Sequence, residues 1–200
     1  MSEAMEEEPA RTEGLRERKR RATRLRIAEE GLRLFVENGY DATTLEAVAV
    51  ASRISARTLF HYFKTKDEIL QFWKGPGFLE ALGPTLLAES ADQPPLDAVL
   101  SCFLKLISRY ETEKSVIVDR ILNSTEALRT RKQAIYVTME QTVFAALCEL
   151  WPRPERRASL RIVAMMAIGA LRLAMEAQRQ ASGTRSLADY LRDNFALLGR

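Results

Sequence analysis

Residues 43–66 constrain the fold of this chain more than any other stretch, because they have the pattern of two short helices joined by a tight turn. Thr43 or Thr44 can cap the first helix, since a threonine hydroxyl accepts a hydrogen bond from a free backbone N–H of the first turn. Ser55 can cap a second helix, residues 56–62, in the same way. The spacing therefore predicts a helix-turn-helix.

The second of these helices has an apolar side and a polar side. Leu59 and Phe63 are spaced to face inward. The other side carries hydrogen-bond donors for phosphates or base edges, namely Arg57, Thr58, His61 and Tyr62. Phe60 can stack on a base or touch a thymine methyl group. A short helix that exposes such donors is typical of one that lies in the major groove of DNA.

The string ISARTLFHYFKTKDEIL resembles the signature of the TetR family of regulators. In that family the recognition helix ends in an aromatic pair, a basic residue follows, and an acid-rich helix start leads into the ligand domain. The resemblance covers residues 20–70 and beyond them depends on length and helical layout. It implies an all-α protein with an N-terminal three-helix DNA-binding domain, residues 16–66. A helical ligand-binding and dimerisation domain, residues 67–200, would follow.

The family pattern also implies a role for each position of the motif. The positions that would approach base edges are Ala56, Arg57 and Phe60. The positions that would hold phosphates are Thr44, Thr58, His61, Tyr62 and Lys66. Their chemistry agrees with this division, because an arginine can bind guanine through two hydrogen bonds, whereas hydroxyls and a lysine suit phosphate oxygens.

Arg53 departs from the family pattern, which usually has a glycine in the turn. A left-handed backbone conformation costs a residue with a side chain more than it costs glycine. Arg53 must therefore adopt a positive φ, or the turn must differ slightly. We interpret the departure as a change in turn geometry rather than loss of the motif, with Arg53 able to reach a phosphate.

Composition limits the class of protein. Of the 200 residues, 46% are hydrophobic and 28% are charged, as in an ordinary soluble globular protein. The longest apolar run, residues 162–171, is well short of the roughly 20 residues that cross a membrane. The acidic residues 1–15 lack the apolar core of a signal peptide and should form a disordered tail. We therefore expect a cytoplasmic protein that makes no membrane contact.

The net charge of +3 conceals a basic cluster directly before the motif. Its members are Arg16, Arg18, Lys19, Arg20, Arg21, Arg24 and Arg26. They can be the solvated start of a first long helix that ends at a glycine cap, Gly39. They can also follow the phosphates or enter the minor groove, and their position next to a DNA-reading motif favours this second interpretation.

The residues needed for catalysis or metal binding are scarce. His61 is the single histidine, and Cys102 and Cys148 lie far apart within apolar helical patterns. Buried structural thiols are the favoured interpretation of both cysteines. We therefore predict no catalytic residues, no metal site and no cofactor, and an enzyme is disfavoured.

The last two helices are expected at residues 155–180 and 187–198. The first of them is apolar nearly all round, so it must be covered on several sides. The family pattern implies that these two helices pair with their copies in the four-helix interface of a homodimer. A monomer with a thick core is the alternative.

The region after the motif begins with a helix at residues 66–74 and a break at Gly75, Pro76 and Gly77, where we expect a kink or a split. The resemblance implies an effector cavity among the later helices. Its candidate lining residues are Phe103, Ile107, Tyr110, Ile121, Tyr136, Met139, Phe144, Met165 and Met166, each of which can instead be plain core. Few charges fall at these inner positions, so a small hydrophobic or amphipathic effector is expected.

These patterns favour a homodimeric regulator that binds a palindromic operator in double-stranded DNA and is released by its effector. In this family such a regulator is most often a repressor. A helix-turn-helix that contacts protein, or one that binds DNA without sequence preference or ligand control, is the alternative.

Overall fold

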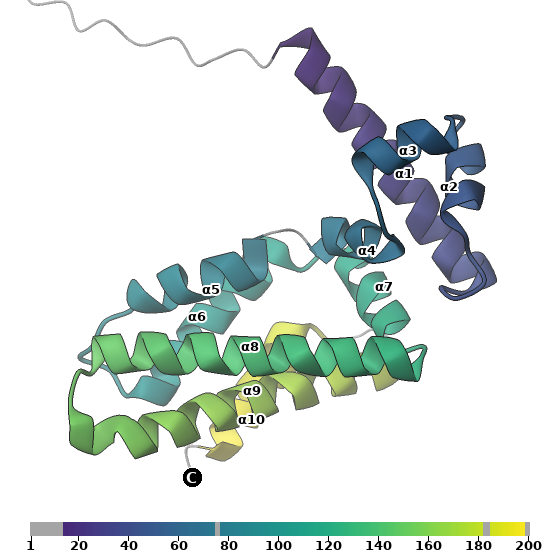
Figure 1. The fold of residues 1–200 in the computed structure, drawn as a ribbon. Helices are drawn as coiled ribbons and strands as arrows, with labels where there is room; N and C mark the ends of the chain where they lie inside the picture. Colours follow the sequence, from purple (N-terminus) through teal and green to yellow (C-terminus); the bar gives the residue numbers. More distant parts are fainter. Residues whose placement is uncertain (1–13, 75–76, 182–184, 199–200) are drawn as a thin grey trace, which may run out of the picture. The chain divides into compact units, whose positions relative to one another are not determined.

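The computed structural model describes residues 14–74, 77–181 and 185–198, and within them every regular element is a helix (Figure 1). The all-α prediction is therefore confirmed. The helices are α1 (Leu15–Asn38), α2 (Leu45–Ala51), α3 (Ala56–Tyr62), α4 (Lys66–Lys74), α5 (Gly77–Leu87), α6 (Pro95–Tyr110), α7 (Glu113–Leu122), α8 (Glu126–Leu150), the 3₁₀ turn η1 (Pro154–Arg156), α9 (Arg157–Gln180) and α10 (Leu187–Leu198). The tail expected at residues 1–15 lies almost wholly outside the described residues.

The chain divides into two compact units, the first ending at Ile69 and the second beginning at Leu70. The division falls within α4, so this helix carries the chain from one unit into the other. The predicted break at Gly75 and Pro76 lies outside the described residues. On either side of it, α4 ends at Lys74 and α5 begins at Gly77.

The first unit is built around one side of α1. Ile27, Ala28, Leu32 and Phe35 of this helix are buried, and α2 and α3 bury their own apolar residues in the same unit. Residues 15–22 are all exposed, so the basic first turns of α1 lie outside the core. Helix α1 ends at Gly39, whose φ of +86° is the left-handed conformation that favours glycine, as the sequence predicted.

The start of α4 belongs firmly to the first unit. A Cβ atom added to Gly31 would lie 2.9 Å from Cγ2 of Ile69, so only glycine allows α1 and α4 to approach this closely. The Tyr40 hydroxyl donates to Oδ1 of Asp67 at 2.8 Å. Nζ of Lys66 donates to the Tyr40 carbonyl oxygen at 2.5 Å and lies 4.5 Å from the centre of the Tyr40 ring. These contacts join the first turn of α4 to the α1–α2 loop.

The second unit is a bundle in which α8 and α9 run alongside each other (Figure 1). Helices α5 and α6 pack on it from one side, and α10 packs against α9 and α6. The rings of Phe103 and Phe195 meet edge to face, with centroids 6.3 Å apart, and so fasten α6 to α10.

The sequence predicts a helix over residues 78–89 that is interrupted at Gly83 and Pro84, since both residue types disfavour a helix interior. The helix instead runs through both. Pro84 is exposed, and its carbonyl oxygen still accepts a hydrogen bond from the Ala88 N–H at 3.2 Å. Proline therefore removes one donor here without ending the helix.

Helix α9 is the helix that is apolar nearly all round in the sequence and was therefore predicted to be covered on several sides. By length and composition alone, the helical stretch 154–180 could cross a membrane, which is weak evidence because the core helix of a globular protein passes the same test. Seven of its residues are buried in the bundle: Leu160, Ala164, Ala167, Ile168, Ala170, Leu171 and Ala174. Ile162, Met165 and Leu173 remain exposed. One side of α9 is thus covered within the chain and another is not.

Candidate nucleic-acid interface

Helix α2 is held at both ends by short-range hydrogen bonds. Thr44 is its cap, with Oγ1 accepting from the Ala47 N–H at 3.1 Å. Thr43 has a different role, because its buried hydroxyl is 2.8 Å from the Gly39 carbonyl oxygen and 3.1 Å from that of Leu34. Of the two threonines the sequence offered, Thr44 starts the helix and Thr43 fixes the loop before it.

The turn between α2 and α3 is built around Arg53, whose φ of +54° places it in the left-handed region. Of the two alternatives in the sequence, a positive φ or a slightly different turn, the positive φ is therefore found. The Ile54 N–H closes the turn on the Ala49 carbonyl oxygen at 3.1 Å. The motif is kept, and Arg53 bears the strain that a glycine would avoid.

Replacing Arg53 by glycine will raise the free energy of unfolding by about 0.5–1 kcal/mol, because glycine adopts this φ without strain and loses only part of that gain to unfolded-chain entropy. Urea unfolding followed by circular dichroism measures the change. Arg57→Gly is the matched control, since the same substitution inside α3 should lower stability by about 1 kcal/mol. An Arg53→Gly protein less stable than the wild type would contradict this account of the turn.

Helix α3 is capped by Ser55, whose Oγ accepts from the Thr58 N–H at 3.1 Å. The predicted bounds, residues 56–62, are those found. Leu59 and Phe63 are completely buried, and the Phe63 N–H donates to the Leu59 carbonyl oxygen at 2.9 Å. Their burial fixes which side of α3 faces outward.

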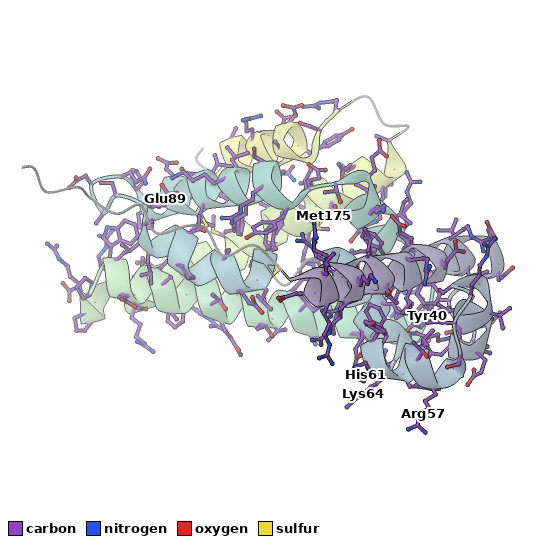
Figure 2. All side chains as sticks on the ribbon, turned by 90° about the horizontal axis from the view of Figure 1, so that it is seen from above. Tyr40, Arg57, His61, Lys64, Glu89 and Met175 are labelled. Atoms are coloured by element: carbon purple, nitrogen blue, oxygen red, sulfur yellow. The ribbon has the colours of Figure 1, made fainter. Side chains whose placement is uncertain are left out.

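The outward side of α3 carries most of the predicted DNA contacts. Arg57, Thr58 and His61 are exposed, and Phe60 is 42% exposed, which is unusual for a phenylalanine. Ala56 and Tyr62 are half-buried. Figure 2 shows Arg57 and His61 extending from the same side of the first unit. Arg57 makes no hydrogen bond or ion pair within the described chain, so its guanidinium is available to a partner.

Lys64 is a residue of this surface that the sequence analysis missed. It is exposed just after α3 and extends beside His61 (Figure 2). Its backbone N–H donates to Oε2 of Glu68 at 2.8 Å, which holds the loop while leaving the ammonium group outside. The two lysines in the string FKTK were the available signal, but only the second matched the family pattern.

Lys66, the predicted phosphate contact, is engaged within the protein. Its half-buried side chain donates to the carbonyl oxygens of Tyr40 and Asp41, at 2.5 and 3.3 Å. Lys66 therefore has a structural role that the sequence did not indicate, in addition to its predicted role as a phosphate contact.

Replacing Lys66 by alanine will lower the free energy of unfolding by roughly 1–3 kcal/mol, because two carbonyl oxygens lose a charged donor. It will also weaken binding to all duplexes and reduce the salt dependence of affinity by about one unit if a phosphate contact is lost. Lys64→Ala is the control, which should change the salt dependence with little loss of stability. An unchanged salt dependence in Lys66→Ala would remove Lys66 from the phosphate contacts.

The family model for bacterial regulatory proteins of the TetR family matches residues 27–71, which include α2, α3, the second half of α1 and most of α4. The helix-turn-helix region of this chain is therefore a TetR-family DNA-binding domain. It is 34% identical over 110 residues to the HTH-type transcriptional regulator TcmR of Streptomyces glaucescens. That match covers 55% of this chain and 48% of TcmR, so the chain spans about half the length of this curated relative.

Solved structures of TetR-family proteins share the fold. A TetR/AcrR-family transcriptional regulator from Aquifex aeolicus VF5 aligns with a TM-score of 0.57 at 20% identity, over 88% of this chain and 98% of that one. The repressor FadR of Thermus thermophilus, solved in complex with lauroyl-CoA, aligns with a TM-score of 0.53 at 23% identity, over 88% and 92% of the two chains. The TetR fold thus extends through the second unit as well as the first.

The second unit brings together only some of the predicted effector-lining residues. Phe103, Ile107, Tyr136 and Met139 lie in one buried core, and Tyr110 and Phe144 pack against it. Ile121 is buried on α7 and Met166 is half-buried on α9. Met165 is 53% exposed, so its placement on the wall of an interior cavity was wrong. Its position three residues after the exposed Ile162 puts it on the uncovered side of α9.

The two cysteines have the environment of structural thiols. Cys102 is fully buried, and burial raises the pKa of its thiol to about 12. Cys148 is half-buried. No cluster of histidine, cysteine or carboxylate side chains that could hold a metal occurs in the described part of the chain.

Proposed function

We propose that this TetR-family chain is a cytoplasmic, homodimeric repressor that binds a palindromic operator and releases it when a small amphipathic effector binds the second unit. The outward side of α3 is the observation that carries the DNA contact. Leu59 and Phe63 fix the helix from within, and the free guanidinium of Arg57 projects where a base edge would lie. This arrangement fits a protein that makes sequence-specific contacts with DNA better than it fits an enzyme.

The uncovered side of α9 supports the homodimer. Ile162, Met165 and Leu173 are exposed and separated by three and eight residues, so they share one face of the helix. Gly169 lies on the same face, and a Cβ atom there would have no neighbour within 4 Å. A second copy of α9 could therefore approach closely at Gly169 and cover the apolar side chains around it. Exposed Leu197 of α10 would extend this surface.

The apolar core around Phe103, Tyr136 and Met139 supports an effector with an acyl or aromatic part. FadR, which shares the fold, was solved with lauroyl-CoA, an amphipathic molecule. Effector binding would shift the dimer toward a spacing of the recognition helices that no longer fits both half-sites.

A gel shift with a palindromic duplex from the protein's own promoter region tests the proposal. Specific binding should persist against competitor DNA at salt concentrations where binding to an unrelated duplex has faded. Equal affinity for the two duplexes at every salt concentration would favour the alternative, a helix-turn-helix that binds DNA without sequence preference.

A further inference from the structure

Three helices of the second unit bring opposite charges together in the interior. Asp119 of α7 lies between Lys132 of α8 and Arg179 of α9. Nζ of Lys132 is 2.6 Å from Oδ1 of Asp119, and Nη1 of Arg179 is 2.9 Å from Oδ2. Asp119 and Lys132 are only 9% and 6% exposed. Buried charges therefore lie at this end of the bundle, close to Tyr136, one of the candidate lining residues.

Positive charge exceeds negative charge in this cluster. Two cations share the single carboxylate of Asp119. A third cation, the Arg172 guanidinium, lies 5.2 Å from the centre of the Tyr136 ring, and Nζ of Lys132 lies 5.6 Å from the same centre. Arg172 makes no ion pair within the described chain. Two other carboxylates of this region accept hydrogen bonds from glutamine side chains: Glu111, after α6, from Gln178 at 2.6 Å, and Glu176 of α9 from Gln180 at 3.2 Å.

Such a cluster has a cost that apolar side chains would avoid. Burial lowers the pKa of Lys132, and the neighbouring Asp119 only partly opposes this. A buried ion pair of this kind often stabilises a fold no more than apolar residues of similar volume. The surplus of cations is instead what would let an external anion compete with Asp119 for Lys132 and Arg179.

The charged cluster can be reached from solvent on one side and borders apolar residues on the other. Arg172 is exposed and the Arg179 side chain is 23% exposed, so an anion can reach them from solvent. Tyr136, one turn after Lys132 on α8, joins the buried core, and its hydroxyl donates to Sδ of Met175 at 3.5 Å. A cationic end thus adjoins an apolar interior, which suits a molecule with a carboxylate at one end of an acyl or aromatic body.

We propose that Lys132 and Arg179 form an anion site in which Asp119 is the resident counter-ion, and that the effector is an amphipathic carboxylate that replaces Asp119 there. This rests on the proposed release of DNA by an effector. Because Asp119 fastens α7 to α8 and α9, its replacement would loosen α7. Helix α7 also carries Lys114, whose Nζ lies 3.9 Å from the centre of the Trp73 ring at the end of α4.

Decanoate and decanol are matched probes for this site, since they share an alkyl chain and differ in the charged group. Binding of each to the full chain is measured by calorimetry and thermal shift. We expect decanoate to bind the wild type at least tenfold more tightly than decanol. Asp119→Asn should bind decanoate at least tenfold more tightly than the wild type does, because the competing carboxylate is gone.

Lys132→Met removes one of the two cations of the proposed anion site while Arg179 still pairs with Asp119, so it should bind decanoate at least tenfold more weakly than the wild type. It also keeps the test decisive if Asp119→Asn fails to fold. The control is Glu140→Gln, which breaks a different ion pair between α8 and α9, 2.9 Å from Arg161, and should leave decanoate binding unchanged.

Three results would overturn the anion site. These are equal binding of decanoate and decanol, unchanged decanoate binding in Lys132→Met, and no decanoate binding by any variant. Operator binding without either probe is measured in parallel. If the wild type binds the operator specifically and any of these three results is found, only the anion site is overturned. If the wild type does not bind the operator specifically, the proposed function is overturned.

Discussion

Substituting glutamate for both Met165 and Leu173 will turn the proposed dimer into a monomer and weaken operator binding at least about 100-fold. Both side chains are more than half exposed, at 53% and 60%, on the uncovered side of α9. In a symmetric interface each chain would contribute two carboxylates, so four unpaired charges would have to be buried. A monomer presents a single recognition helix to a palindrome and loses the second half-site. Light scattering gives the molecular mass, and fluorescence anisotropy gives the affinity.

Val137→Glu is the control for this double variant. Val137 is 55% exposed on α8, so the substitution adds the same charge to an apolar surface residue outside the proposed interface. The Val137→Glu protein should remain a dimer with wild-type affinity for the operator. A dimeric Met165→Glu/Leu173→Glu protein would exclude the uncovered side of α9 as the interface.

Replacing Arg57 by alanine will weaken operator binding by about 2–6 kcal/mol, because a bidentate contact discriminates by roughly 1–3 kcal/mol and a dimer has two copies of it. Affinity for an unrelated duplex will fall far less. Among operator duplexes mutated one base pair at a time, the variant protein will have lost its preference at one position in each half-site. Competition anisotropy at fixed salt measures both effects.

His61→Ala is the matched control on the same outward side of α3. Because His61 is predicted to contact a phosphate, its replacement should weaken binding to all duplexes by a similar factor. The base preference at every position should stay unchanged. The same pattern of base preference in the Arg57→Ala and His61→Ala proteins would show that the division into base-reading and phosphate-binding residues is wrong.

The helix-turn-helix could be predicted closely from the sequence because its determinants are local. A cap and the N–H group that it binds are three residues apart, as for Ser55 and Thr58, so both ends of the interaction are visible in one short string. The position of the turn at Arg53 was visible for the same reason, but its positive φ was only one of two alternatives. Short apolar spacing also fixed which residues of α3 face inward, and Leu59 and Phe63 are buried as expected.

Contacts between distant segments could not be predicted in this way. Arg179 is 60 residues from its partner Asp119, and Lys66 is 26 residues from the Tyr40 carbonyl oxygen. In α9 the difficulty was of another kind, because a helix that is apolar nearly all round does not reveal which side its own chain covers. Met165 was therefore assigned to the interior, whereas it lies on the uncovered side.

The close approach of Ile69 to Gly31, together with the bonds from Lys66 and Asp67 to Tyr40, makes the first turn of α4 part of the first unit. An effector that acts through α4 would then move each first unit as a block and leave the surface of α3 unaltered. Every target sequence would lose affinity by the same factor, and their ranking would not change. In a cell with several operators, the weakest would consequently be vacated at the lowest effector dose and the strongest only at the highest.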